Sequence, residues 1–127
     1  MISLFAFAFL PLNVERKKHM LIDKKSIDLL FHKGKSIKSF PIIIYAINSK
    51  ENKVLFSVSK KFFLKAVDRN KIKRQLKSIY FNNYNLVQDK IKNKTIAFVY
   101  ISKTKSTYLQ LQNKMLYLIS SINKDEE

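Results

Sequence analysis

The stretch Ser57-Val-Ser-Lys-Lys-Phe-Phe-Leu-Lys-Ala-Val-Asp-Arg-Asn-Lys-Ile-Lys-Arg-Gln-Leu-Lys77 holds the densest positive charge in the sequence. From residue 60 to residue 77 it contains eight basic residues and a single acid, Asp68. Two of the three arginines in the chain, Arg69 and Arg74, lie here. A guanidinium group can bind a phosphate through two hydrogen bonds and can stack on a base, whereas a lysine cannot. These arginines therefore indicate a partner that carries phosphate.

A helical wheel drawn over residues 66–83 separates two neighbouring faces. The apolar face, expected to pack on a sheet, holds Ile72, Leu76 and Ile79, with Tyr80 at its border. The adjoining basic face comprises Asn70, Lys73, Arg74 and Lys77, and Arg69 lies at the border between the two faces. No acid interleaves the basic face, and like charges at i, i+4 destabilise a helix. This pattern favours an anionic ligand over simple solvation.

Composition narrows the classes of function. The chain has 127 residues, enough for one domain, and a formal net charge of +16. A charge of this size favours nucleic acid as the partner, or less often an anionic membrane surface. The absence of cysteine excludes disulfides, thiolate chemistry and zinc-finger cysteines, and it suits a cytoplasmic protein. The single glycine excludes glycine-rich phosphate loops.

The first twelve residues are almost entirely apolar, but they are too few to span a bilayer. The basic residues Arg16, Lys17 and Lys18 follow this run, whereas in a signal peptide they would precede it. Three interpretations of residues 1–20 stay open: an arm packed on the domain, a mobile tail, or an upstream extension with Met20 as an internal start. We expect the folded domain to occupy residues 21–123 and a polar tail to occupy residues 124–127.

The rest of the chain indicates alternating helices and strands. Asp23 is a candidate N-cap, and Gly34 is expected to end that helix with a positive φ. The β-branched and aromatic run 40–47 and the alternating run 53–59 predict two strands, joined as an antiparallel hairpin by the polar residues 48–52. Residues 94–101, apolar on both faces, predict a central third strand, and Ser106 or Thr107 is expected to cap a last helix.

The predicted fold is a two-layer α/β sandwich (α+β) in which the helices pack against one sheet, in the order α-β-β-α-β-α. No catalytic set of side chains and no metal-ligand spacing is present; His19 and His32 are not paired at any such spacing. Asp68 is interpreted as a charge that favours the helix N-terminus. Aromatic residues on elements next to the basic segment are candidate stacking platforms for single-stranded nucleic acid, although each could equally be a core residue: Phe31, Phe40, Tyr45 and Phe56.

These features of the sequence resemble a known family, the protein subunit of bacterial ribonuclease P. The similarity rests on Ser57-Val-Ser-Lys-Lys61, then Lys65-Ala-Val-Asp-Arg-Asn-Lys-Ile-Lys-Arg74, and on the upstream segment 27–36 with its closing glycine. It covers roughly residues 21–122. Lys77 replaces an arginine of the family motif, and Phe62 or Phe63 replaces its usual glycine. The first dozen residues match no part of the family pattern.

The resemblance implies a ribosomal-protein-like domain with a left-handed βαβ crossover, although the general rule favours the right hand. It also implies a role in the endonucleolytic removal of the 5′ leader from precursor tRNA, as part of an endoribonuclease whose RNA subunit carries the chemistry with Mg²⁺. The implied partners are ribonuclease P RNA and precursor tRNA, with no membrane and no evident obligate protein partner. The implied leader-cleft residues are Ile27, Phe31 and Tyr45. The implied RNA-binding residues are Lys60, Lys61, Lys65, Arg69, Asn70, Lys71, Lys73, Arg74 and Lys77.

Two alternatives stay open at this stage. A structural RNA-binding protein, such as a ribosomal protein, would account for the charge and the fold. A membrane-surface protein anchored by residues 1–12 would account for the apolar segment.

Overall fold

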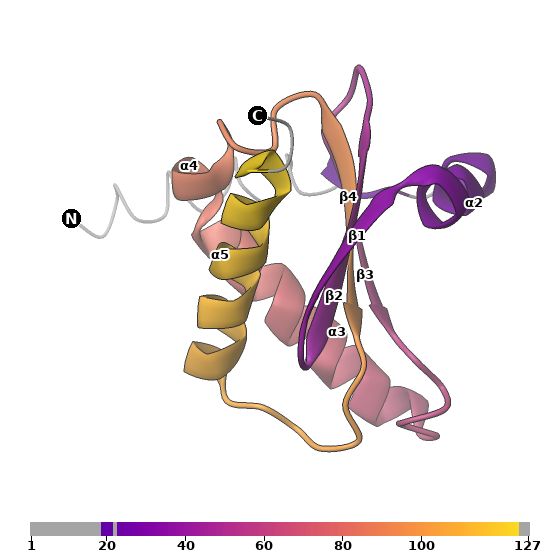
Figure 1. Ribbon diagram of the computed structural model, residues 1–127. Coiled ribbons are helices and arrows are strands. Elements are labelled where there is room, and N and C mark those ends of the chain that lie inside the picture. The colour runs from indigo at the N-terminus through magenta and orange to yellow at the C-terminus, as the bar shows by residue number, and fades with distance from the viewer. Residues whose placement is uncertain (1–18, 22, 125–127) are drawn as a thin grey trace, which may run out of the picture.

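The computed structural model describes residues 19–21 and 23–124 as one four-stranded sheet with helices on both faces (Figure 1). The helices are α2 (Lys24–Lys33), α3 (Ala66–Asn82), α4 (Tyr84–Val87) and α5 (Tyr108–Lys124). The strands are β1 (Lys35–Ser39), β2 (Ile42–Asn48), β3 (Lys53–Val58) and β4 (Lys94–Tyr100). Helices α3 and α5 cover one face of the sheet, and α2 lies on the other (Figure 1). The predicted α/β sandwich is confirmed, and the predicted first helix, α2, lies on the face of the sheet opposite to α3 and α5.

Strand β4 is central, as its two apolar faces predict. The strand order is β1-β2-β4-β3, in which β4 pairs antiparallel with β2 and parallel with β3. Six of its seven residues are buried, among them Ala97 and Phe98 with no exposed surface. A strand that is paired on both edges and covered on both faces is typically a continuous apolar run, and residues 96–100 of β4 form such a run.

The predicted hairpin between 40–47 and 53–59 is wrong, because β4 lies between β2 and β3. The turn that joins them instead wraps around the start of β4. The backbone N–H of Ser49 donates to the Asn93 carbonyl at 2.8 Å, and the Lys94 N–H donates to Asn52 Oδ1 at 3.2 Å. A short polar loop is typical of a hairpin, but a loop of this length can also connect two strands that lie on either side of a third strand.

The true hairpin joins β2 to β1, a strand that the predicted element order lacks. Its sequence, Lys-Ser-Ile-Lys-Ser, has a single apolar residue, so periodicity alone gave no signal. Strand β1 pairs with β2 from Lys35↔Ala46 to Ser39↔Ile42 and forms one edge of the sheet. Lysines on an edge strand disfavour pairing with another chain, and Lys35 and Lys38 are both exposed.

The residues that flank α2, Asp23 and Gly34, form its N-cap and C-cap. Asp23 accepts from the Ser26 hydroxyl at 2.8 Å and from the Ser26 N–H at 3.3 Å, which confirms it as the N-cap. These hydrogen bonds hold the pKa of the Asp23 carboxyl below its ordinary value, and the bond from the Ser26 hydroxyl has the largest effect. Gly34 ends the helix, but the expected positive φ is wrong: φ is −71° and ψ is 152°. A glycine is needed there because a Cβ would lie 2.3 Å from the Leu30 carbonyl oxygen.

The α3 face of the sheet carries the larger core. Ile42, Ile44 and Ala46 of β2 pack there against α3 and α5, and Ile72, Leu76 and Ile79 of α3 are buried as predicted. The last helix is capped by Thr107, whose hydroxyl accepts from the Gln110 N–H at 3.2 Å. The apolar residues that recur at helical spacing along α5 are buried, except for Tyr108 at 39% exposure; the buried ones are Leu111, Met115, Leu118, Ile119 and Ile122. The smaller core lies on the α2 side, where Leu21 and Leu30 cover Ala97.

The crossover from β3 through α3 to β4 joins neighbouring parallel strands. Its expected left hand stays a prediction.

No helix among the described residues is long and apolar enough to cross a membrane. Residues 1–18, and with them the predicted apolar arm, lie outside the described residues.

A Gly34→Ala substitution should lower the free energy of unfolding by about 1–3 kcal/mol, because the new methyl group must displace the last turn of α2 or the end of β2. Urea denaturation measures the change. The matched control is Ser36→Ala, two residues further along and exposed. Equal stability of the two variants would show that the close approach at Gly34 does not constrain the fold.

Candidate RNA interface

The loop between β3 and α3 presents two lysines at an anchored turn. Ser59 organises the turn: its hydroxyl accepts from the Lys61 N–H at 3.1 Å, and its carbonyl accepts from the N–H groups of Phe62 and Phe63 at 3.2 and 3.3 Å. Phe63 is buried, with its ring centroid 6.2 Å from that of Tyr100. The two phenylalanines thus fix the turn where the family pattern has glycine, and Lys60 and Lys61 are left exposed.

Arg69 stabilises the same loop rather than pointing freely into solvent. Its Nη1 donates to the Phe63 carbonyl at 2.7 Å and to the Leu64 carbonyl at 2.8 Å. The sequence places Arg69 at the border between the apolar and basic faces, and the structure shows why this position matters. A planar guanidinium can reach two consecutive carbonyls, which a lysine ammonium does less well. Arg69 therefore positions the loop that carries Lys60, Lys61 and Lys65.

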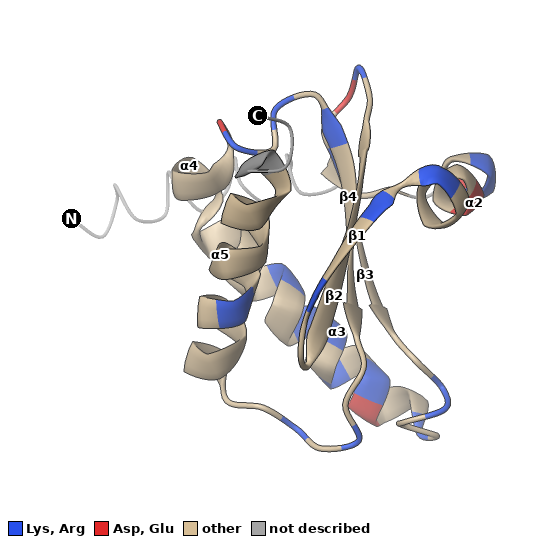
Figure 2. Cartoon of the chain, viewed as in Figure 1, with Lys and Arg blue, Asp and Glu red and all other residues tan. Residues whose placement is uncertain are grey.

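The predicted basic face of α3 forms one wall of a groove. Asn70, Lys73, Arg74 and Lys77 line it together with Met20, Phe56 and Val67, around an open volume of about 580 Å³. Lys71 is exposed on the same helix but does not line the groove. Figure 2 shows the basic residues spread along α3, with one acidic position near its start. That acid, Asp68, lies 3.7 Å from Lys105 Nζ and so pairs outside the groove.

The three apolar lining residues of the groove were not predicted from the sequence. Phe56 is on β3 and is buried at 5% exposure, and Val67 is in the first turn of α3 at 63% exposure. Met20 reaches the groove because it forms an isolated parallel bridge with Val54. Of the candidate platforms, Phe56 is therefore a core residue, whereas Phe40 is exposed in the turn between β1 and β2.

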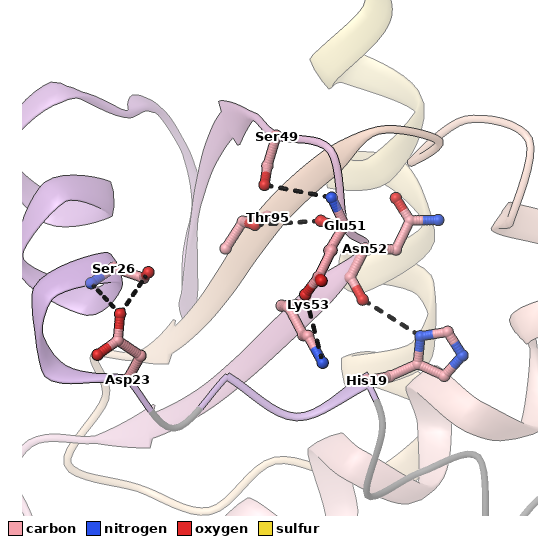
Figure 3. Close-up of polar contacts among 8 residues, drawn as sticks. All are labelled: His19, Asp23, Ser26, Ser49, Glu51, Asn52, Lys53 and Thr95. Carbon is pink, nitrogen blue, oxygen red and sulfur yellow. Dashed lines mark hydrogen bonds and ion pairs between the residues drawn. The ribbon is translucent and has the colours of Figure 1, made fainter.

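The segment that leads into α2 is pinned to the start of β3 (Figure 3). The His19 ring nitrogen Nδ1 lies 3.2 Å from the Asn52 carbonyl oxygen, and the Leu21 N–H donates to the Val54 carbonyl at 2.8 Å. The His19 ring also lies 5.2 Å from the ring of Tyr84. These contacts fix Met20, and with it one end of the groove.

The predicted leader-cleft residues come together on the opposite face of the sheet. The rings of Phe31 and Tyr45 meet edge to face with their centroids 4.8 Å apart, and Ile27 and Tyr45 pack against the small core beneath α2. Phe31 is 36% exposed, so part of its ring reaches solvent.

Beside this aromatic pair the sheet is only partly covered. One cross-strand row, Ser36–Tyr45–Ala97–Leu55, contains residues that pack against α2. The next row is Lys38–Ile43–Val99–Ser57, and its members are half-buried or exposed. We call this second row, with Phe31 and Tyr45, the open face.

Strand β3 connects the two surfaces. Because side chains alternate along a strand, Leu55 and Ser57 point to the α2 side of the sheet, where Ser57 is part of the open face, and Phe56 and Val58 point to α3. β3 is also an edge strand. Along this edge, Val54 is paired with Met20 and Leu21.

Replacing Arg69 by alanine should lower the free energy of unfolding by about 1–2 kcal/mol, because two loop carbonyls lose a charged donor. Arg69→Lys, which keeps the charge, should recover only part of this loss. The control is Arg74→Ala, since no hydrogen bond or ion pair joins Arg74 to another described residue. Thermal denaturation measures all three variants, and identical stability of R69A and R74A would contradict the loop-positioning role.

Comparisons with known proteins identify the family of this chain. A family model described as ribonuclease P matches residues 16–123. The ribonuclease P protein component of Finegoldia magna is 32% identical over 108 residues, which cover 80% of this chain and 88% of the relative. That of Porphyromonas gingivalis is 32% identical over 95 residues, covering 68% of this chain and 69% of the relative.

Solved structures show the same fold. The ribonuclease P protein of Staphylococcus aureus superposes with a TM-score of 0.68 at 26% identity, covering 82% of this chain and 94% of that one. The Thermotoga maritima protein, at 22% identity, superposes with a TM-score of 0.69 and covers 79% and 94% of the two chains. The assignment favours the ribonuclease P interpretation over the ribosomal-protein alternative. This chain belongs to the protein component family of ribonuclease P, whose known role is the processing of the tRNA 5′ leader.

Proposed function

We propose that the chain grips the catalytic RNA of ribonuclease P through the α3 groove and holds the 5′ leader of precursor tRNA on the open face. The observation that carries the proposal is the groove itself, which gathers Asn70, Lys73, Arg74 and Lys77 and no acidic side chain. In protein–DNA complexes, half or more of the hydrogen bonds go to phosphate and sugar. The positive charges of Lys73, Arg74 and Lys77 on α3 are suited to bind the phosphates of an RNA backbone.

The loop residues Lys60, Lys61 and Lys65 extend this surface toward the end of β3. They are exposed, and the turn that carries them is held by Ser59 and Arg69. A preorganised loop loses less conformational entropy when it binds than a mobile one. In the proposal these lysines contact backbone phosphates beyond the groove, and Lys71 contacts phosphates from the outer side of α3.

The open face suits a single strand. An aromatic pair beside an accessible sheet surface offers platforms on which unpaired bases can stack, and the phenol of Tyr45 adds a polar group. Ile27 and Tyr45 pack against the same small core, so Ile27 helps to hold Tyr45 in place. Duplex RNA presents no free base faces, so the proposal assigns this surface to the unpaired leader rather than to the tRNA body.

Cleavage is assigned to the RNA subunit with Mg²⁺, which would supply the activated hydroxide and stabilise the leaving oxygen. Among the described residues no group of three or more His, Asp or Glu side chains lies together. Magnesium prefers oxygen ligands, usually carboxylates and phosphates. We therefore place the Mg²⁺ ions on the RNA and the substrate, and the protein binds, orients and neutralises charge. The cytoplasm, where tRNA is made, is the proposed location.

Lys73→Ala and Arg74→Ala should weaken binding to ribonuclease P RNA and flatten its salt dependence. With about five phosphate contacts, log K for the wild type should fall against log salt with a slope of roughly −3.5 to −4.5. Each lost contact should reduce the magnitude of the slope by about 0.7–0.9. Filter binding across a salt series gives both numbers. Lys114→Ala, an exposed lysine on α5, is the matched control.

Two results would contradict the groove assignment. One is a wild-type slope close to zero. The other is a double variant K73A/R74A that folds, binds the RNA and supports cleavage of precursor tRNA at low Mg²⁺ as well as the wild type does.

Phe31→Ala should weaken binding of precursor tRNA by the reconstituted holoenzyme by roughly fivefold or more, because one stacking platform is lost. Mature tRNA, which lacks the leader, should bind equally well with or without the substitution. Leu29→Ala on the same helix is the control, since Leu29 is 46% exposed and lies outside the small core. If F31A affected mature and precursor tRNA alike, the open face would not be the leader site.

A further inference from the structure

The α3 groove has two chemically different parts. We call its cationic lining residues, Lys73, Arg74 and Lys77, together with the Asn70 amide, the rim, and its apolar lining residues, Met20, Phe56 and Val67, the floor. The volume of about 580 Å³ lies within the range of about 300–1,000 Å³ that is typical of small-ligand sites. Phosphate binding alone requires the rim but gives no reason for the floor.

Val67 is the least expected member of the floor. It is 63% exposed in the first turn of a highly charged helix, and it lines the groove, whereas Leu64, at 87% exposure, does not. The positions 67, 70, 74 and 77 recur at helical spacing, so the apolar residue continues the line of the RNA-binding side chains. A ligand that lies along this line meets three polar groups and then one apolar group.

Met20 lines the same groove from a part of the chain outside α3. Its place is fixed by the bridge to Val54 and by the contact of His19 with Asn52. A thioether side chain is flexible and polarisable, and it adapts well to a flat aromatic surface. The edge strand β3 supplies the third apolar lining residue, Phe56, which is 5% exposed.

A ligand for this groove has to combine anionic groups with a flat apolar surface. Paired RNA offers the phosphates, but its bases are stacked within the helix and are not available to a floor of this kind. An unpaired nucleotide offers both, since its base has two apolar faces and a polar edge, and phosphates flank it.

We propose that the groove receives one unpaired nucleotide of the catalytic RNA, with the base against Met20 and Val67 and the flanking phosphates on Lys73, Arg74 and Lys77. The Asn70 amide, which can both donate and accept, faces the base edge. This inference rests on the proposed function, in which the groove binds that RNA. It adds that the groove recognises a local RNA structure and not charge alone.

The test separates apolar from ionic contacts. Val67→Ser removes apolar surface, keeps the charge and affects an exposed position in a first helical turn, where serine is well tolerated. The affinity for ribonuclease P RNA should fall by roughly three- to tenfold, with the salt slope unchanged. Leu64→Ser, the matched control, should change the affinity by less than about twofold, as expected for a surface substitution. Thermal denaturation verifies that both variants fold.

Chemical probing of the same complexes locates the nucleotide. Dimethyl sulfate, which modifies exposed base edges, should show an unpaired base protected by the wild type and by L64S and reactive with V67S. Hydroxyl-radical protection of the backbone beside that base should be the same in all three complexes.

Three outcomes overturn the inference. If V67S and L64S give equal affinities and footprints while K73A still weakens binding, the groove holds backbone only, and the proposed function stands. If removal of residues 1–12 tightens RNA binding by the wild type but not by V67S, the chain's own apolar segment occupies the floor. If K73A also leaves binding unchanged, the proposed function fails together with the inference.

Discussion

The fold depends on the burial of β4 between two partner strands and two layers of helix. Because its residues are apolar on both faces and its backbone is paired on both edges, β4 can occupy only the interior of the sheet. This placement leaves β3 at an edge, and α3 leads from β3 back to β4 in the interior. Both candidate surfaces follow from that arrangement, since alternate side chains of β3 serve the groove and the open face.

The basic helix illustrates how the core supports an unfavourable charge pattern. Each like-charge pair at helical spacing opposes helix formation by only about 0.2–0.5 kcal/mol. Burial of a large apolar side chain contributes about 1.5–3 kcal/mol, and Ile72, Leu76 and Ile79 are at most 3% exposed. The packing of one face therefore outweighs the repulsion along the other. A cationic ridge can be kept in place before any RNA is bound, which reduces the ordering required on association.

Sequence reasoning succeeded where the relevant information is local and periodic. The two faces of α3 were predicted because helical spacing alone separates Ile72 from Lys73. Strand pairing was not, since a loop of four or five residues fits a hairpin and a step over β4 equally well. Gly34 was assigned the right position for the wrong reason, because its close neighbour is the Leu30 carbonyl and not a left-handed turn. Met20 was missed as a groove residue because only tertiary structure brings it to the groove that α3 lines. Phe31 and Tyr45 were candidate stacking platforms from their residue type and position, but their assignment to a leader cleft, together with Ile27, came from the resemblance.

The central position of β4 also has a consequence for synthesis on the ribosome. The chain makes β2 and β3 first, and each must wait for residues 94–100 before its main partner exists. Until then two apolar strands have unpaired edges, a situation that favours misassociation in slow, non-local folding. The first half of the nascent chain is thus more vulnerable to aggregation than the finished protein. The many lysines between the strands help to keep that intermediate dispersed.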